Sequence, residues 1–212
     1  SLGSQVLGFV GPSDSDDVES GRYGLEKFYN DLLAGKNGRK ENGKLLTLPE
    51  AGGNLTLTID PNIQKEAQKI LGGLVANFKA KGGSVIVQEP KTGRILALEN
   101  YPSFDPNNYG QASISSFLNP AIQTIYEPGS VFKVITMAAG IDAGKFSPET
   151  TFYDKGSLTV SGRTIKNWDL RTYGKQTMTN VLENSINTGA VFAQRKTGPD
   201  IFYNYLVKFG FN

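Results

Sequence analysis

Residues 126–145, YEPGSVFKVITMAAGIDAGK, are the stretch that decides the fold. Pro128 and Gly129 interrupt the structure before them, and Ser130 then stands where the N-cap of a helix is expected. The residues that follow are almost all apolar. A helix with almost no polar face is typical of the interior of a domain. We therefore predict a helix that begins at Ser130 and is buried on all sides.

Lys133 is the exception within this apolar run. In the first turn of a helix it lies at the positive end of the helix dipole, where a cation is disfavoured by about 0.3–1 kcal/mol. Local stability therefore gives no reason for a lysine here, and burial would favour its neutral amine. A neutral amine three residues after Ser130, on the same helical face, could accept the proton of the serine hydroxyl. The spacing predicts a serine nucleophile with a lysine base, beside backbone N–H groups that could hold an oxyanion.

A second candidate group is Ser185-Ile186-Asn187, which interrupts two stretches with helical apolar periodicity. We place it in a short turn between two helices. Serine and asparagine are ordinary cap and turn residues, so this group alone would indicate only a turn. Beside Ser130 and Lys133 it gains chemical meaning. The Ser185 hydroxyl could relay a proton, and the Asn187 carboxamide could bind both the lysine and a substrate amide.

Composition excludes several other kinds of site. The 212-residue chain contains no His and no Cys, so a Ser-His-Asp triad, a cysteine nucleophile and the usual zinc ligand sets are all unavailable. Its net charge of +2, with no basic run interleaved with aromatics, makes nucleic acid an unexpected partner. The most apolar stretch, residues 131–141, is far shorter than the roughly 20 residues of a membrane span.

The first quarter of the chain indicates a small N-terminal part. Residues 13–21 are acidic and rich in serine, which predicts a loop. Residues 23–33 have the apolar spacing of one helix, which Gly35 should end. Residues 35–53 are rich in glycine and predict a linker. We place the domain boundary there, between residues 52 and 53.

The remainder indicates a larger domain. Residues 54–59, NLTLTI, alternate as in a strand, and Asp60-Pro61 predicts the N-cap and first position of a helix that runs to about Phe78. Residues 84–88 and 94–100 predict a hairpin whose turn is Glu89 to Gly93. Beyond Ser130 the pattern turns helical, with glycines in the loops.

Several stretches resemble the transpeptidase domains of penicillin-binding proteins. Ser-x-x-Lys together with a Ser-x-Asn element belongs to the signature of these proteins and of class A β-lactamases. The resemblance extends over residues 85–109, 119–133 and 181–198, and essentially over residues 54–212. Residues 21–38, GRYGLEKFYNDLLAGKNG, are similar to the end of the non-catalytic pedestal of monofunctional class B members. The resemblance implies an α+β fold, an antiparallel sheet covered by helices, with a pedestal remnant in residues 1–52 and the N-terminal part of a transpeptidase domain in residues 53–212.

The resemblance also implies a chemistry. Family members cross-link peptidoglycan stem peptides that end in D-Ala-D-Ala through an acyl-enzyme, and β-lactams acylate the same serine. Carried onto this chain, Ser130 is the nucleophile, Lys133 the acylation base, Ser185 the proton relay and Asn187 a ligand of substrate and lysine. No metal or organic cofactor is implied. The family further implies an extracytoplasmic catalytic domain on the bacterial cell membrane, with an anchor upstream, and division or elongation proteins as partners through the pedestal.

A third family motif, Lys-Thr-Gly on a strand, is expected downstream of the Ser-x-Asn turn. The chain contains this string twice, at residues 91–93 and 196–198. We interpret the first as a hairpin turn and the second as a helix stop, because Gly198 and Pro199 follow an apolar-periodic stretch. Neither copy has the context of a strand. We therefore expect the sequence to be a fragment, truncated at both ends, without the third motif.

Two other functions share this signature. A β-lactamase must deacylate quickly, and class A enzymes use a glutamate-activated water for this step. Only Glu149 and Glu183 lie between the two groups, and neither is in a Glu-x-x-x-Asn context. A non-catalytic β-lactam sensor or structural partner is the second alternative. The choice between a division and an elongation role stays open, with the EPGSVFK context leaning to division.

The interpretation of the two Lys-Thr-Gly strings makes a prediction. In the whole protein, Lys91→Ala and Lys196→Ala should each leave the rate of acylation by a labelled penicillin within a few fold of the parent. A large loss at either lysine would identify that string as a working motif.

Overall fold

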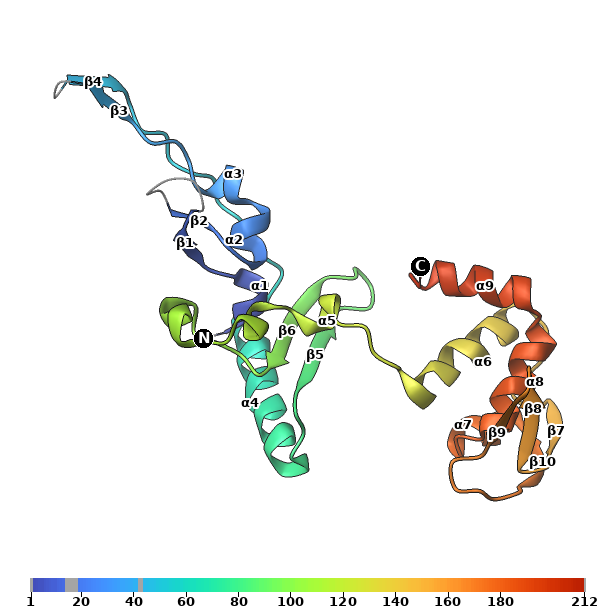
Figure 1. Ribbon diagram of the computed structural model, residues 1–212. Coiled ribbons are helices and arrows are strands. Elements are labelled where there is room, and N and C mark those ends of the chain that lie inside the picture. Colours follow the sequence, from blue (N-terminus) through green and yellow to red (C-terminus); the bar gives the residue numbers. More distant parts are fainter. Residues whose placement is uncertain (1, 14–18, 42–43, 212) are drawn as a thin grey trace. The chain divides into compact units, whose positions relative to one another are not determined.

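The computed structural model describes residues 2–13, 19–41 and 44–211, which form two compact units, unit 1 (residues 1–125) and unit 2 (residues 126–212) (Figure 1). Unit 1 contains α1 (Ser4–Leu7), β1 (Val10–Pro12), β2 (Glu19–Gly21), α2 (Gly24–Phe28), α3 (Asn30–Leu33), β3 (Arg39–Glu41), β4 (Lys44–Thr47), α4 (Pro61–Phe78), β5 (Gly83–Gln88), β6 (Ile95–Tyr101), η1 (Pro106–Gln111), η2 (Ile114–Phe117) and α5 (Pro120–Gln123). Unit 2 contains η3 (Gly129–Phe132), α6 (Lys133–Asp142), β7 (Thr151–Asp154), β8 (Ser157–Val160), β9 (Arg163–Lys166), β10 (Gly174–Thr177), α7 (Met178–Glu183), α8 (Asn187–Thr197) and α9 (Pro199–Lys208). Helices and antiparallel ladders together agree with the predicted α+β class. None of the described helices is long and apolar enough to cross a membrane.

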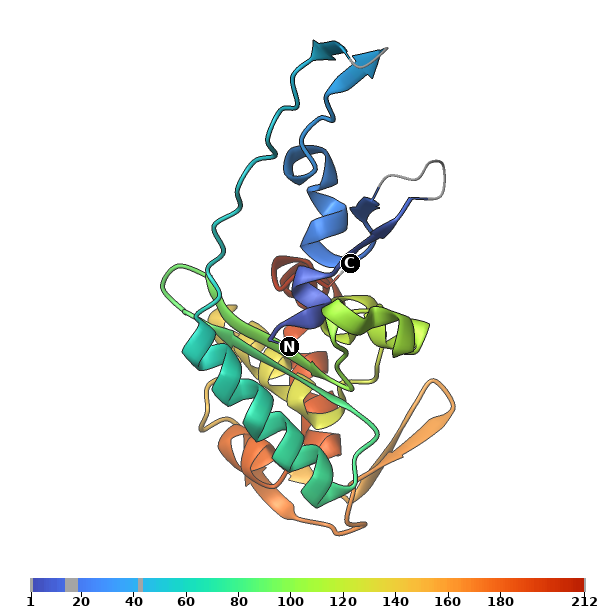
Figure 2. The same cartoon turned by 90° about the vertical axis from the view of Figure 1, so that its left-hand side faces the viewer.

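Helix α4 and the β5–β6 ladder form the best predicted part of the molecule. The Asp60 carboxylate caps α4 by accepting from the N–H groups of Asn62 and Ile63 at 2.8 and 3.1 Å. The buried stripe Ala67, Leu71 and Val75 has helical spacing, and α4 contacts both strands of the ladder (Figure 2). One face of this ladder is therefore covered by a helix, as expected.

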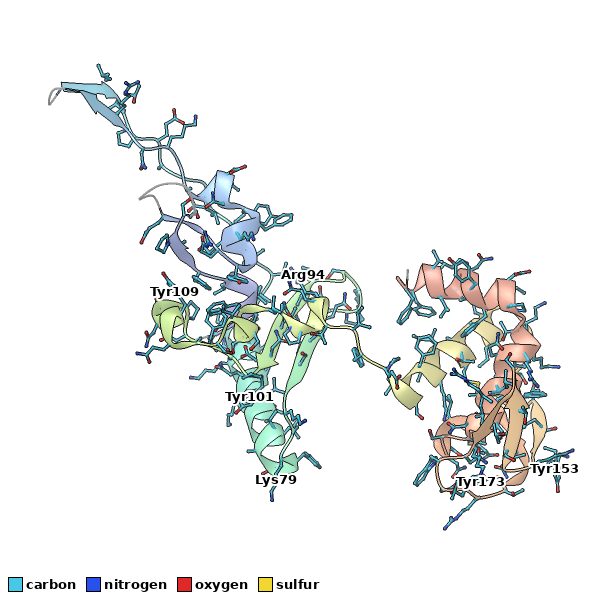
Figure 3. The ribbon with its side chains drawn as sticks, in the orientation of Figure 1. Lys79, Arg94, Tyr101, Tyr109, Tyr153 and Tyr173 are labelled. Carbon is cyan, nitrogen blue, oxygen red and sulfur yellow. The ribbon has the colours of Figure 1, made fainter. Side chains whose placement is uncertain are left out.

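The turn between β5 and β6 contains the first Lys-Thr-Gly string. The Thr92 hydroxyl donates to the Glu89 carboxylate, and the Arg94 Nε lies 3.2 Å from a Glu89 oxygen. Arg94 is labelled beside this turn in Figure 3. Gly93 has a φ of 76°, the left-handed backbone that a tight turn requires. The predicted hairpin and its turn are confirmed.

Residues 54–59 do not form the predicted strand. The Thr58 hydroxyl of this segment donates to the Ile95 carbonyl of β6 at 2.6 Å, and the N–H of Asp60, the residue after the segment, donates to the Leu96 carbonyl at 2.8 Å. Alternation of apolar and polar residues therefore marks an extended segment here, but the backbone pairs too little with its neighbour to form a ladder.

The N-terminal segment also differs from expectation. The helix predicted over residues 23–33 is two short helices, α2 and α3, because the backbone leaves helical geometry at Tyr29, whose φ is −108°. The predicted linker carries the paired strands β3 and β4. Of the predicted loop at residues 13–21, residues 14–18 lie outside the described residues, and residues 19–21 form β2, paired with β1.

An aromatic cluster holds unit 1 together. Phe9, Phe104 and Phe117 are buried, and Tyr23 and Tyr109 pack against them. The Phe9 ring stacks on Tyr109 with 4.2 Å between centroids. The cluster joins residues near the start of the chain to residues that follow β6. The domain boundary at residues 52 and 53 stays a prediction.

Unit 2 is built around α6 and α8, which contact each other and both contact α7 and α9. Its core is a cluster of buried residues from α6, α7, α8, β7 and the loops that adjoin them: Met137, Phe146, Phe152, Met178, Val181, Ile186 and Ala193. The expectation of helices and loops after residue 130 is wrong for residues 151–177. Strand β7 pairs with β10, and β8 pairs with β9 through a turn in which Ser161 and Gly162 both have positive φ. That turn geometry is the one favoured in two-residue hairpins.

Candidate active site

The candidate site lies wholly within unit 2, where a helical segment and a turn meet. Gly129, with φ of 65°, turns the chain into the 3₁₀ segment η3, and α6 follows η3 directly at Lys133. Ser130 is exposed and lies inside η3, so the prediction that it is the N-cap is wrong. Pro128 occupies the position before η3, which begins at Gly129, and it makes no side-chain capping bond. Ser130 and Lys133 remain one turn apart on a continuous helical path.

The helix is not buried on all sides. Val131 in η3 and Val134 in α6 are 70% and 62% exposed, whereas Met137 and Gly140 of α6 are buried within unit 2, where α7, α8 and α9 contact this helix and cover one face of it. Lys133 lies on that covered face and is 8% exposed. The prediction of a buried lysine is therefore confirmed, although the reason is the packing of one helix face.

The Lys133 amine is held by the turn between α7 and α8. It lies 2.6 Å from the Ser185 carbonyl oxygen, 2.9 Å from the Ser185 Oγ and 2.7 Å from the Asn187 Oδ1. The structure therefore brings together three of the four predicted residues. Within the described part of the chain, all three bonds of this amine go to the turn, and Ser130 is not among its partners.

The same contacts accommodate both protonation states of Lys133. An ammonium donates to all three oxygens, whereas a neutral amine has two N–H groups and one lone pair. In the neutral state the Ser185 hydroxyl becomes the donor in the 2.9 Å contact. Burial lowers the pKa of the Lys133 amine from its ordinary value. The turn thus places beside the lysine a hydroxyl that can act as hydrogen-bond acceptor or donor.

The α7–α8 turn owes its shape to packing beneath it. Ser185 has a φ of 52°, in the left-handed region that a serine seldom adopts. Ile186 is fully buried in the core cluster, and its N–H donates to the Val181 carbonyl at 2.9 Å. A Cβ on Gly189 would lie 2.3 Å from a methyl carbon of Val181, so only glycine allows α8 to approach α7 this closely. The buried isoleucine and the glycine fix the turn that presents Ser185 and Asn187.

A buried polar group below the turn was not anticipated from the sequence. Asp154, Asn167 and Thr188 are all buried and hydrogen-bonded to one another. In addition, the Asn187 Nδ2 donates to the Lys166 carbonyl at 2.8 Å. One sequence signal exists in hindsight. Asp154 lies two residues after the buried Phe152 on β7. Side chains two residues apart on a strand share one face, so the carboxylate of Asp154 also faces inward.

The second Lys-Thr-Gly string is the predicted helix stop. Helix α8 ends at Thr197, Gly198 follows with φ of 88°, and α9 begins at Pro199. The first copy therefore lies in a turn and the second at the end of a helix, and neither lies on a strand.

Comparison with known proteins places the chain in a family. Residues 83–212 match the family model described as the penicillin binding protein transpeptidase domain. Stage V sporulation protein D of Bacillus subtilis is 33% identical over 222 residues, covering 98% of this chain and 34% of that protein. A peptidoglycan D,D-transpeptidase FtsI homolog of Mesostigma viride is 38% identical over 165 residues, covering 74% of this chain and 27% of that protein. The chain thus spans about a third of the length of such relatives.

A solved structure supports the same relationship. The crystal structure of penicillin binding protein 3 from Mycobacterium tuberculosis superposes with a TM-score of 0.84 at 31% identity, covering 99% of this chain and 45% of that one. The match therefore extends to the arrangement of the backbone. The chain belongs to the penicillin-binding protein transpeptidase family.

Proposed function

We propose that this chain supplies the nucleophile and the proton-transfer groups of a serine acyl transferase that cross-links peptidoglycan stem peptides and is inhibited by β-lactams. The observation that carries the proposal is the buried Lys133 amine, held at 2.6–2.9 Å by Ser185 and Asn187 one helical turn beyond Ser130. The name of the Mesostigma viride relative, a peptidoglycan D,D-transpeptidase, agrees with this activity.

The proposed reaction has two acyl-transfer steps. The Ser130 Oγ attacks the carbonyl carbon of the penultimate residue of a stem peptide ending in D-Ala-D-Ala, and its proton passes to the neutral Lys133 amine. The amide C–N bond then breaks, and the terminal D-Ala leaves after its nitrogen receives a proton through the Ser185 hydroxyl. The amine of a second stem peptide attacks the ester, forms the cross-link and returns the proton to Ser130.

Asn187 has a double part in this proposal. Its Oδ1 accepts from Lys133, while its Nδ2 is 2.8 Å from the Lys166 carbonyl. The carboxamide therefore holds the amine in place, and in this proposal it also binds a substrate amide. The chemistry needs only Ser, Lys and Asn side chains from this chain.

Transfer is favoured over β-lactam hydrolysis by the position of the acidic residues. Glu149 and Glu183 are both exposed, and Glu183 accepts from the Asn180 Nδ2 at 3.2 Å on α7. Among the described residues, no carboxylate is a hydrogen-bond partner of the Lys133 amine. A water-activating glutamate of the class A kind therefore has no counterpart beside the lysine.

The organisation and location follow from the same proposal. We infer that residues 1–52 are the end of a pedestal, that residues 53–212 begin the transpeptidase domain, and that the protein acts at the outer face of a bacterial cell membrane, where its polymeric substrate lies. Division or elongation proteins are proposed to bind through the pedestal. The pairing of β1 with β2 and of β3 with β4 gives that part structure of its own.

The first test concerns the nucleophile. A fluorescent penicillin added to the whole protein should give a stable adduct that peptide mapping places on Ser130, and Ser130→Ala should abolish labelling. Ser147→Ala, which changes an exposed serine of the same unit, is the control and should label fully. An adduct at another residue would refute the assignment, and steady turnover of the penicillin would identify a hydrolase.

The second test concerns the base. Lys133→Arg should slow acylation by about 10²-fold or more, because arginine stays protonated and cannot accept the serine proton. Lys145→Arg, at an exposed lysine just after α6, should leave the rate unchanged. Acylation of the Lys133→Arg protein at the parent rate, with the fold verified by circular dichroism, would rule out Lys133 as the base.

The third test measures the protonation of Lys133 directly. Titration of its ¹³Cε resonance should give a midpoint below the ordinary lysine pKa of 10.5, because burial disfavours the ammonium. The unfolded chain then binds this proton more tightly, so the contribution of Lys133 to folding stability should rise with pH from the folded midpoint up to about 10.5. The Lys133→Arg spectrum assigns the resonance. A midpoint at or above 10.5 would mean that the three oxygen contacts outweigh burial.

A further inference from the structure

The proposed chemistry leaves one buried ionisable group of unit 2 without a role. Asp154 is fully buried, and its carboxylate accepts four hydrogen bonds. Oδ1 accepts from the Gly156 N–H at 2.9 Å and from the Thr188 hydroxyl at 2.6 Å, and Oδ2 accepts from the Asn167 Nδ2 and the Tyr173 N–H, both at 2.8 Å. Burial raises the pKa of Asp154, but the four bonds outweigh burial and lower it below its ordinary value. The group is a carboxylate at neutral pH.

Two partners of the Asp154 carboxylate lie next to Asn187 or to the residue that binds it. Thr188 directly follows Asn187 in α8. Asn167 directly follows Lys166, whose carbonyl accepts from the Asn187 Nδ2. Asp154 therefore fixes Asn187 from two sides, once through the first turn of α8 and once through the end of β9.

The start of α8 depends on this network because it lacks a local cap. Ile186 is the N-cap residue and makes no side-chain capping bond. The Thr188 N–H points instead to the Asn167 Oδ1 at 3.4 Å. The same loop continues to Tyr173, which leads into β10 beside β7 (Figure 3). A buried carboxylate on β7 and the loop it binds thus replace the usual capping side chain.

The orientation of the Asn187 carboxamide follows from its two neighbours. Its oxygen faces the Lys133 amine, a donor, and its nitrogen faces the Lys166 carbonyl, an acceptor. A flipped amide would set donor against donor and oxygen against oxygen. Any shift of Lys166 or of Thr188 would therefore reach the Lys133 amine through a single side chain.

We propose that Asp154 is a positioning residue, which acts through Thr188, Asn167 and Asn187 to hold the Lys133 amine in place for acyl transfer. The proposal rests on the proposed function for its kinetic consequence, whereas its geometric consequence, the environment of Lys133, is measured without activity. Asp154 touches neither the lysine nor Ser130, so its effect on the rate is indirect.

The test compares two threonines of the same helix. Thr188 and Thr197 are both buried. The Thr188 hydroxyl donates to the Asp154 carboxylate at 2.6 Å, whereas the Thr197 hydroxyl donates to the Ala193 carbonyl at 2.8 Å. In the whole protein, Thr188→Val should lower the first-order rate constant of penicillin acylation about tenfold or more, the scale expected for a small misplacement of a reacting group. The dissociation constant of the non-covalent penicillin complex should change less than twofold. Thr197→Val should change neither, and Thr188→Ser, which keeps the hydroxyl, should stay within threefold of the parent.

The ¹³Cε resonance of Lys133 provides the second readout. It should move in Thr188→Val and in Asp154→Asn, and stay in place in Thr197→Val, with folding of each variant verified by thermal unfolding. If Asp154→Asn does not fold, the comparison of Thr188→Val with Thr197→Val still tests the proposal. Equal rates and an unmoved resonance in Thr188→Val would overturn the proposal. If the parent protein forms no adduct at Ser130, the proposed function fails, and the resonance still reports whether Asp154 positions the lysine.

Discussion

The buried amine of Lys133 is the constraint on which the site of unit 2 depends. An amine removed from water must find acceptors, since an unpaired buried donor costs about 1–3 kcal/mol, and more if charged. Ser185 supplies two oxygens and Asn187 supplies a third. Three acceptors around one nitrogen require the chain to turn sharply between α7 and α8, and the left-handed Ser185 backbone makes that turn. The shape of the turn is therefore what allows the lysine amine to be buried with its hydrogen bonds satisfied.

Much of the fold was predictable because its signals are local. Asp60 and Pro61 mark the start of α4 by capping chemistry that is confined to the four consecutive residues 60–63. The turn from Glu89 to Gly93 closes β5 onto β6 for the same kind of reason. The Ser185 turn was also predictable, because it separates two apolar-periodic stretches. Within the site, the sequence predicted that Lys133 is buried and that Ser185 and Asn187 lie in the turn that contacts it.

What could not be predicted depends on contacts between distant residues. Residues 54–59 alternate like a strand, yet pairing decides whether a strand exists, and alternation says nothing about the partner. Val131 in η3 and Val134 in α6 are exposed although the apolar sequence predicts a buried helix, because burial depends on which faces the neighbouring elements cover. Asp154 is the clearest case. Its four donors come from 2 to 34 residues away, and no spacing rule joins them.

At Ser185 the residue that would give the most stable backbone differs from the residue that supplies a hydroxyl to Lys133. Left-handed geometry costs a non-glycine residue roughly 1–2 kcal/mol, and glycine would adopt it without that cost. Glycine, however, has no hydroxyl for the lysine. Selection for stability alone would therefore remove this side chain, and its presence in a strained conformation is a mark of selection for something else. A search for thermostable variants of this protein should leave Ser185 unchanged. The glycine that would relieve its backbone strain would also remove the hydroxyl that contacts the Lys133 amine.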